Sequence, residues 1–116
     1  PDILLAMTQE SFDKFSGSVK NNGVIIADTT YVKNIGDVQA KIFACPITEL
    51  TQKELGSRLY ANVAALGMLA YLFSTIDFHF FEEAVSDRVP TAFREANMNA
   101  LRAGYRWAEE YAQERM

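Results

Sequence analysis

Cysteine and histidine are almost absent from this sequence, since Cys45 and His79 are the only residues of their kinds. A single cysteine excludes an internal disulfide and any cysteine-rich metal or iron–sulfur site within the chain. One free thiol is typical of a reducing compartment, so we expect a cytoplasmic protein. The sequence also lacks a GxGxxG or P-loop pattern, a signal peptide and a hydrophobic stretch long enough to span a membrane.

Positively charged residues are fewer than negatively charged ones. Eleven Lys and Arg residues stand against 15 Asp and Glu residues, for a net charge of −4. Nucleic acids and anionic membranes are therefore poor candidates for partners. The length of 116 residues and the hydrophobic content of 49% fit one globular domain, residues 1–116. There is no initiator methionine and a strand is predicted almost at once, so we expect the C-terminal part of a longer polypeptide.

The most apolar stretch, residues 59–73, contains no charged side chain. Its alanines, leucines and methionine favour a helix, and a helix that is apolar on nearly every face is buried on nearly every face. Gly67 in its middle costs about 1 kcal/mol relative to alanine, so we expect another backbone to come close there. The stretch therefore predicts a central core helix or a helix that another subunit covers.

Two asparagines lie on predicted helices at apolar positions. Asn62 is in the first turn of the apolar helix, and Asn97 shares a face with Phe93 and Leu101 of the last helix. A buried amide must be hydrogen-bonded, because an unpaired one costs about 1–3 kcal/mol. Capping of a neighbouring loop is the favoured interpretation for both residues, and contact with a ligand or partner subunit is the alternative.

Three short apolar runs, residues 3–7, 24–27 and 41–45, predict strands. They do not alternate between apolar and polar residues, which is typical of a parallel sheet covered on both faces. Thr8 is a plausible N-cap for a helix over residues 9–19, and strand, helix and strand make a compact βαβ unit. The direction of the third strand stays open. We expect an α/β fold with three layers, a mostly parallel sheet and covering helices, lacking its N-terminal strands.

The second half of the chain predicts further helices. Residues 47–58 form a charged linker or short helix that Gly56 ends, and Asp77 caps a helix over residues 78–88. Pro90 opens the last helix, which extends towards Met116. The apolar face predicted for this last helix consists of Phe93, Ala96, Ala100, Leu101, Gly104, Ala108 and Tyr111.

Polar residues follow each predicted strand. Thr8 and Gln9 follow the first, Asp28, Thr29 and Thr30 the second, and the segment Pro46-Ile47-Thr48 the third. Ligands bind outside the carboxyl ends of strands in open α/β sheets, and these ends share one edge if the sheet is parallel. This cluster is the best candidate site in the chain. The favoured alternative is that these side chains only form turns and helix caps.

Neither Cys45 nor His79 predicts a catalytic set. Cys45 ends an apolar strand, so a buried and inert thiol is expected rather than a nucleophile. His79 has no identifiable carboxylate or nucleophile partner in the sequence, and an ordinary histidine on a helix surface or interface is expected.

Several segments in a fixed order resemble a known family. They are residues 1–7, 23–28, 46–50, 62–67 and 97–105. In these segments and their spacing the chain resembles the gamma subunit of 2-oxoacid:ferredoxin (acceptor) oxidoreductases, over essentially its full length. Gamma chains of that family open with a glycine-rich GxGGQG turn, which this sequence does not contain.

The resemblance implies a role within a complex. Gamma assembles with alpha and beta subunits, often with a ferredoxin-like delta subunit. The complex oxidatively decarboxylates a 2-oxoacid with coenzyme A, and thiamine diphosphate and iron–sulfur clusters are held by other subunits. We expect a non-catalytic gamma chain, with 2-oxoglutarate as the favoured substrate ahead of pyruvate and branched-chain or indolyl oxoacids. The residues proposed to face a ligand or partner are Thr8, Gln9, Asp28, Thr29, Thr48, Asn62 and Asn97.

Two other functions are alternatives to this one. A self-contained small-ligand or nucleotide-binding module is suggested by the strand-end cluster, but the chain has no glycine-rich loop. A hydrolase that uses His79 or Cys45 has no catalytic set to support it. On the oxidoreductase hypothesis, Asp28→Ala would raise the apparent KM for coenzyme A. We also expect the isolated chain to self-associate, because missing strands would leave an apolar patch exposed.

Overall fold

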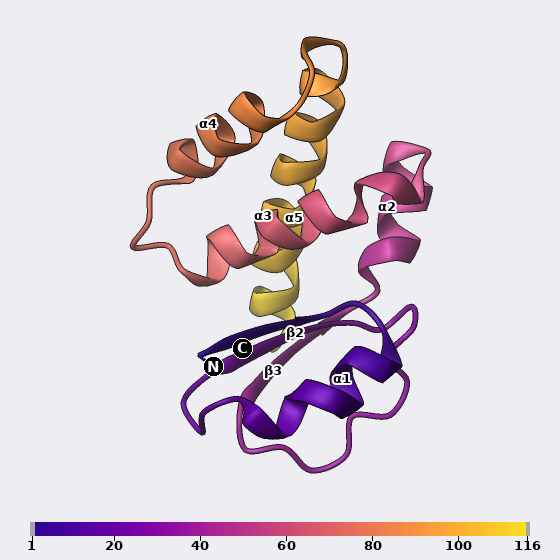
Figure 1. Cartoon of the computed structure of the whole chain (residues 1–116), viewed down its shortest axis with the longest axis vertical. Coiled ribbons are helices and arrows are strands. Elements are labelled where there is room, and N and C mark those ends of the chain that lie inside the picture. Colours follow the sequence, from indigo (N-terminus) through magenta and orange to yellow (C-terminus); the bar gives the residue numbers. More distant parts are fainter. Residues whose placement is uncertain (1, 116) are drawn as a thin grey trace. The chain divides into compact units, whose positions relative to one another are not determined.

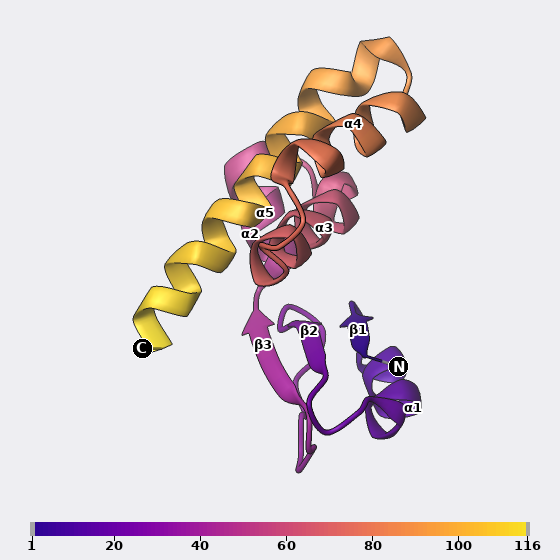
Figure 2. The ribbon, with the colours of Figure 1, turned by 90° about the vertical axis from the view of Figure 1, so that its left-hand side faces the viewer.

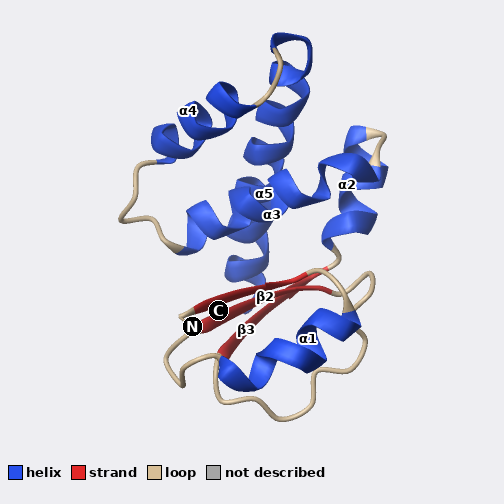
Figure 3. Ribbon diagram, in the orientation of Figure 1, coloured by secondary structure: helices blue, strands red, loops and turns tan. Residues whose placement is uncertain are grey.

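The computed structural model describes residues 2–115, which divide into two compact units between Glu49 and Leu50. The first carries a three-stranded sheet and one helix, and the second is built from helices, as the colouring by secondary structure shows (Figure 3).

The sheet consists of β1 (Ile3–Ala6), β2 (Val24–Asp28) and β3 (Lys41–Cys45), in that order (Figure 1). All neighbouring strands are parallel. The α/β class and the parallel sheet predicted from the continuous apolar runs are therefore confirmed, and the direction of the third strand is now settled. A parallel arrangement places the carboxyl ends of β1, β2 and β3 at one edge, where the candidate site was expected.

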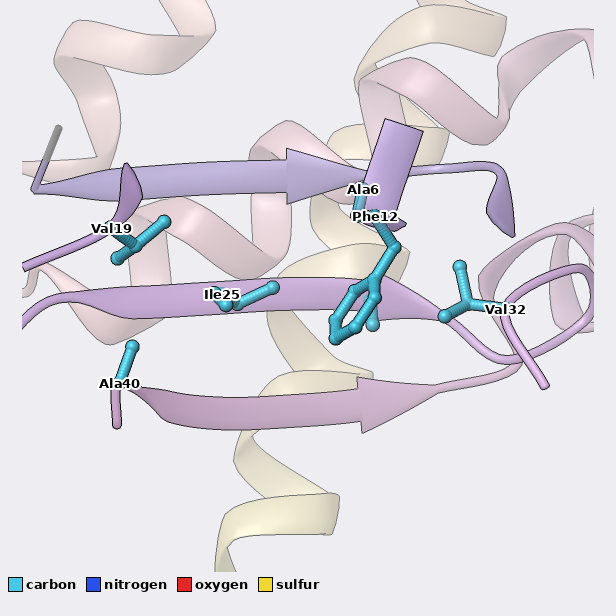
Figure 4. Packing of buried hydrophobic residues seen from close by; sticks show 7 residues of the cluster. Ala6, Phe12, Val19, Ile25, Val32 and Ala40 are labelled. Atoms are coloured by element: carbon cyan, nitrogen blue, oxygen red, sulfur yellow. The ribbon is translucent and has the colours of Figure 1, made fainter. Parts of the chain in front are cut away.

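Helix α1 (Gln9–Phe15) packs on this sheet through Phe12, which is 2% exposed. Thr8 is its N-cap, as predicted, because its hydroxyl accepts a hydrogen bond from the amide of Ser11 at 3.1 Å. Around Phe12 lies the core of the first unit, in which Ile25 of β2 and Val32 of the following loop are also buried (Figure 4). Because these side chains are buried against one another, they hold both α1 and the loop after β2 in place on the sheet.

The second unit contains most of α2 (Ile47–Leu55), then α3 (Ala61–Leu72), α4 (Phe78–Arg88) and α5 (Arg94–Arg115) (Figures 1 and 2). Gly56 follows α2 with φ of 79°, a left-handed conformation that glycine adopts without strain. Asp77 caps α4 by accepting from the amide of His79 at 2.9 Å, as predicted. Phe81 and Val85 of α4 pack with Met98 and Leu101 of α5 in one cluster.

Helices α3 and α5 cross at two glycines. A Cβ atom on Gly67 would collide with the carbonyl oxygen of Leu101, and one on Gly104 would collide with that of Ala64. The prediction that another backbone comes close to Gly67 is therefore confirmed. Neighbouring positions on both helices are alanines with almost no exposed surface, among them Ala65. Small residues at a helix crossing let the two backbones approach closely.

Two apolar side chains assigned to buried faces are exposed instead: Leu59 is 85% exposed and Phe93 is 54% exposed. Leu59 lies in the 3₁₀ turn η2 (Arg58–Tyr60) and Phe93 in η3 (Thr91–Phe93), each directly before a helix, and a further 3₁₀ turn, η1 (Ser16–Ser18), follows α1. A 3₁₀ turn has about 3.0 residues per turn, so it rotates Leu59 and Phe93 away from the stripe that a 3.6-residue period predicts. The helices predicted over residues 9–19 and 59–73 were accordingly too long.

Trp107 of α5 was missed by the sequence analysis. It is 2% exposed, and its indole Nε1 donates to Glu54 Oε2 of α2 at 2.8 Å. Arg106 donates to the same oxygen at 2.7 Å. One carboxylate thus anchors two neighbouring donors of α5 to the end of α2, both within the second unit. Trp107 lies three residues after Gly104, so the predicted apolar stripe could have included it.

Between residues 2 and 115, no helix is long and apolar enough to cross a membrane.

Candidate site at the carboxyl ends of the strands

Asp28, the last residue of β2, is completely buried. Its carboxylate accepts hydrogen bonds from the amide of Thr30 at 3.0 Å, from the amide of Thr48 at 3.2 Å and from the hydroxyl of Thr48. Thr48 is itself only 7% exposed and lies in the first turn of α2. The carboxylate therefore satisfies the Thr48 amide, which has no partner within the helix, and its negative charge is favourable at this end of the helix.

Thr30 completes this cap. Its hydroxyl oxygen accepts from the amide of Glu49 at 3.0 Å, so consecutive amides at the start of α2 are bonded to side chains of the loop after β2. A helix N-terminus is a ready anion site only while its amides are free. Because side chains already use the amides of Thr48 and Glu49, they are not available to a phosphate group.

Gln9, in the first turn of α1, forms hydrogen bonds with the same loop. Its Oε1 accepts from the amides of Lys33 and Asn34 at 2.7 and 2.8 Å, and its Nε2 donates to the carbonyl of Asn34 at 2.8 Å. The side chain acts as a clamp between the first turn of α1 and the connection that leads to β3. Together with the capping role of Thr8, this supports the interpretation of the strand-end residues as turn and cap residues.

A pocket of about 580 Å³ opens beside this network. It has one lysine, Lys33, and one carboxylate, Glu49, and Lys33 Nζ donates to the carbonyl of Thr29 at 2.8 Å. Of the three strand-end segments predicted to form a site, the second contributes Thr29 and Thr30 to the pocket lining and the third contributes Pro46. Lys33 and Glu49 were missed, because each lies outside the short segment that directly follows a strand. The complete lining is Thr29, Thr30, Val32, Lys33, Ile35, Pro46 and Glu49.

Asn62 and Asn97, the other predicted site residues, belong to the second unit. Asn62 is exposed, so the expectation of a buried amide was wrong at this position. The first turn of α3 directs it away from the crossing that Ala64 and Gly67 make with α5. Asn97 is buried at 8% exposure, and its Nδ2 donates to the carbonyl of Phe93 at 2.8 Å. The Asn97 amide group thus has its partner in η3, the 3₁₀ turn directly before α5.

Cys45 and His79 do not form a catalytic set. Cys45 is buried, as predicted. The His79 side chain is 71% exposed, and it does have carboxylate partners: Nε2 lies 3.0 Å from Glu83 and Nδ1 lies 3.6 Å from Glu82. The sequence analysis missed these i+3 and i+4 neighbours. Over the described residues, no group of three or more histidine, cysteine or acidic side chains could hold a metal ion.

Comparison with known protein families shows which family the chain belongs to. The family described as pyruvate ferredoxin/flavodoxin oxidoreductase matches residues 1–107. The chain belongs to this family. Membership agrees with the resemblance noted from the sequence segments.

Curated relatives within the pyruvate ferredoxin/flavodoxin oxidoreductase family include archaeal proteins. The 2-oxoglutarate synthase subunit KorC of Methanocaldococcus jannaschii is 30% identical over 112 residues, covering 95% of this chain and 60% of KorC. The ketoisovalerate oxidoreductase subunit VorA of Methanothermobacter marburgensis is 31% identical over 117 residues, which are 95% of this chain and 23% of VorA. The chain thus spans about 60% of the length of KorC.

Solved structures of oxidoreductase subunits share the fold. The gamma subunit of the keto/oxoacid ferredoxin oxidoreductase from Geobacter sulfurreducens superimposes with a TM-score of 0.88 at 34% identity, over 94% of this chain and 64% of that one. The pyruvate oxidoreductase subunit PORC from Thermotoga maritima gives a TM-score of 0.72 at 20% identity, over 91% and 62%. The second match shows the fold alone.

Proposed function

We propose that this chain is part of the gamma subunit of a 2-oxoacid:acceptor oxidoreductase complex, in which it is not itself catalytic. The observation that carries the proposal is the TM-score of 0.88 to an oxoacid ferredoxin oxidoreductase gamma subunit at 34% identity. The complex would convert a 2-oxoacid and coenzyme A into an acyl-CoA and carbon dioxide and pass the electrons to ferredoxin or another acceptor. We favour 2-oxoglutarate, because KorC, a 2-oxoglutarate synthase subunit, matches over 60% of its length, whereas VorA matches over 23%.

The proposal assigns thiamine diphosphate and iron–sulfur clusters to the alpha and beta subunits and to a ferredoxin-like delta subunit where one is present. The donor set of this chain supports that assignment. An iron–sulfur cluster needs several thiolates, and the sequence supplies only Cys45, which is buried. The single free thiol also supports a cytoplasmic location for the complex. The contribution of this chain would then be assembly and the shaping of a surface near the substrates.

Assembly is the first expected result. A tag on this chain, expressed in its own cells, should recover a large complex with at least two other subunits in native mass spectrometry, because the proposal places the catalytic groups on those subunits. Iron and thiamine diphosphate should be found in the same sample. A lone species with the mass of this chain or its dimer, free of both, would contradict the proposal.

The strand-end pocket is proposed to face coenzyme A. Its place at the carboxyl edge of a parallel sheet supports this, as does Lys33, the lysine in its lining, which can attract an anionic group. In the assembled complex, Lys33→Ala should raise the apparent KM for coenzyme A roughly fivefold, since an exposed charge contributes about 1 kcal/mol, and leave kcat unchanged.

Lys41→Ala is the matched control, because Lys41 is also exposed but begins β3 at the opposite edge of the sheet. Initial rates at varied coenzyme A concentration measure both variants. If Lys33→Ala and Lys41→Ala share the KM of the unmodified complex, the pocket does not face coenzyme A.

A further inference from the structure

An apolar groove of about 500 Å³ runs between α3 and α4 in the second unit. Val63 and Leu66 of α3 form one wall, and Phe80 and Ala84 of α4 form the other. Val89 follows α4 at one end of the groove. Nothing in the strand-end pocket or its network involves these residues, so the groove is a separate feature of the chain.

Phe80 is exposed to an extent that is costly for a free protein. Its 62% exposure exceeds that of Phe15 and Phe93, the other exposed phenylalanines. Its inner neighbour Phe81 packs edge-on against it at 5.8 Å between ring centroids and is 8% exposed. Complete burial of such a ring is worth about 1.5–3 kcal/mol. Aromatic and arginine side chains that become buried on binding are the anchors of interaction hot spots, and Phe80 would be such an anchor when a partner covers the groove.

Arg88 gives the groove its charge. It is the charged residue of the groove lining, and no side chain of residues 2–112 forms a salt bridge with it. Glu82, which precedes Arg88 by six residues on α4, already forms a salt bridge with Arg102 at 2.9 Å. The guanidinium is therefore free to bind a carboxylate from outside the chain, and an arginine–carboxylate pair can form parallel hydrogen bonds.

We infer that this groove docks an apolar segment of another subunit of the complex, with a carboxylate on that segment bound by Arg88. The inference rests on the proposed function for the existence of the other subunits. Charge argues against a second copy of this chain as the occupant. If two copies met groove to groove, Arg88 would face a lining with a second positive charge and no negative one.

The test uses the complex purified through a tag on this chain. Phe80→Ser removes the apolar anchor, and Arg88→Glu reverses the charge. Each should lower the occupancy of one other subunit in native mass spectra at least tenfold. Arg88→Lys keeps the charge and should retain that subunit more fully than Arg88→Glu does. Phe93→Ser is the matched control, because Phe93 is similarly exposed but lies outside the groove lining.

A photo-crosslinking amino acid at position 80 identifies the occupant directly. The expected product joins this chain to a peptide of the subunit that Phe80→Ser displaces, and that peptide should carry an Asp or Glu beside its apolar residues. A crosslink to a second copy of this chain would overturn the inference. So would full occupancy of every subunit in both Phe80→Ser and Arg88→Glu, a result that leaves the proposed function standing. Absence of any other subunit from the unmodified sample would instead overturn the proposed function itself.

Discussion

Gly104→Ala should destabilise the protein by about 3 kcal/mol or more, at the upper end of the range for overpacked cores. The added methyl would have to occupy the position of the Ala64 carbonyl, and a backbone cannot yield as the end of a flexible side chain can. Helix propensity alone predicts the opposite sign, because alanine is about 1 kcal/mol better than glycine within a helix. Gly67→Ala should behave in the same way against Leu101. Thermal unfolding followed by circular dichroism should show a midpoint lower by about 10 °C.

Gly17→Ala provides the control for both substitutions. A Cβ on Gly17 would meet no atom within 4 Å, and its φ is not positive, so the change should shift stability by no more than about 0.5 kcal/mol. A higher unfolding midpoint in Gly104→Ala would contradict the close approach of the α3 and α5 backbones at Gly104.

Asp28→Ala should cost about 3 kcal/mol of folding free energy, because it removes the acceptor for three buried or part-buried donors at once. The amide and hydroxyl of Thr48 would be left in a site with almost no access to water. Loss of the helix cap of α2 adds to this cost. Urea unfolding, with the slope checked for change, measures the difference.

Asp28→Asn separates the shape of the side chain from its charge. The amide oxygen can still accept hydrogen bonds, but one of the two carboxylate oxygens is replaced by a donor, so we expect a smaller loss than in Asp28→Ala. This result also bears on the expectation that Asp28→Ala raises the KM for coenzyme A. Because Asp28 is buried and caps α2, a kinetic effect at this position would reflect a disturbed loop, and Lys33 gives the cleaner test. Unchanged stability in Asp28→Ala would contradict the assigned cap.

The elements of this fold could be predicted where local chemistry determines them. Continuous apolar runs fixed the strands, Thr8 and Asp77 acted as the caps that their side chains suggested, and Gly67 marked a close backbone approach. The ends of the helices were less predictable. The 3₁₀ turns beside Phe15 and Leu59 change the residue period, and the sequence carries no strong signal for that change.

The grouping of the strand-end residues was predictable from the sequence, but the roles of their side chains were not. A parallel sheet places polar residues from separate strands at one edge, and Asp28 does meet Thr48 there. The roles differ because burial turned Asp28 into a cap, whereas Lys33 and Glu49 reached the pocket through the loop after β2 and the first turn of α2. Such long-range contacts depend on the three-dimensional path of the chain, which residue spacing does not encode.

The burial of Trp107 gives the protein an optical reporter for one of its units. It is the single tryptophan of the chain and lies in the second unit, so the first unit has no indole chromophore. Tryptophan emission during unfolding therefore follows the helices from Leu50 onwards, while far-ultraviolet circular dichroism follows both units. Coincident transitions would mean that the two units unfold cooperatively, and separate transitions would mean that each loses its structure on its own.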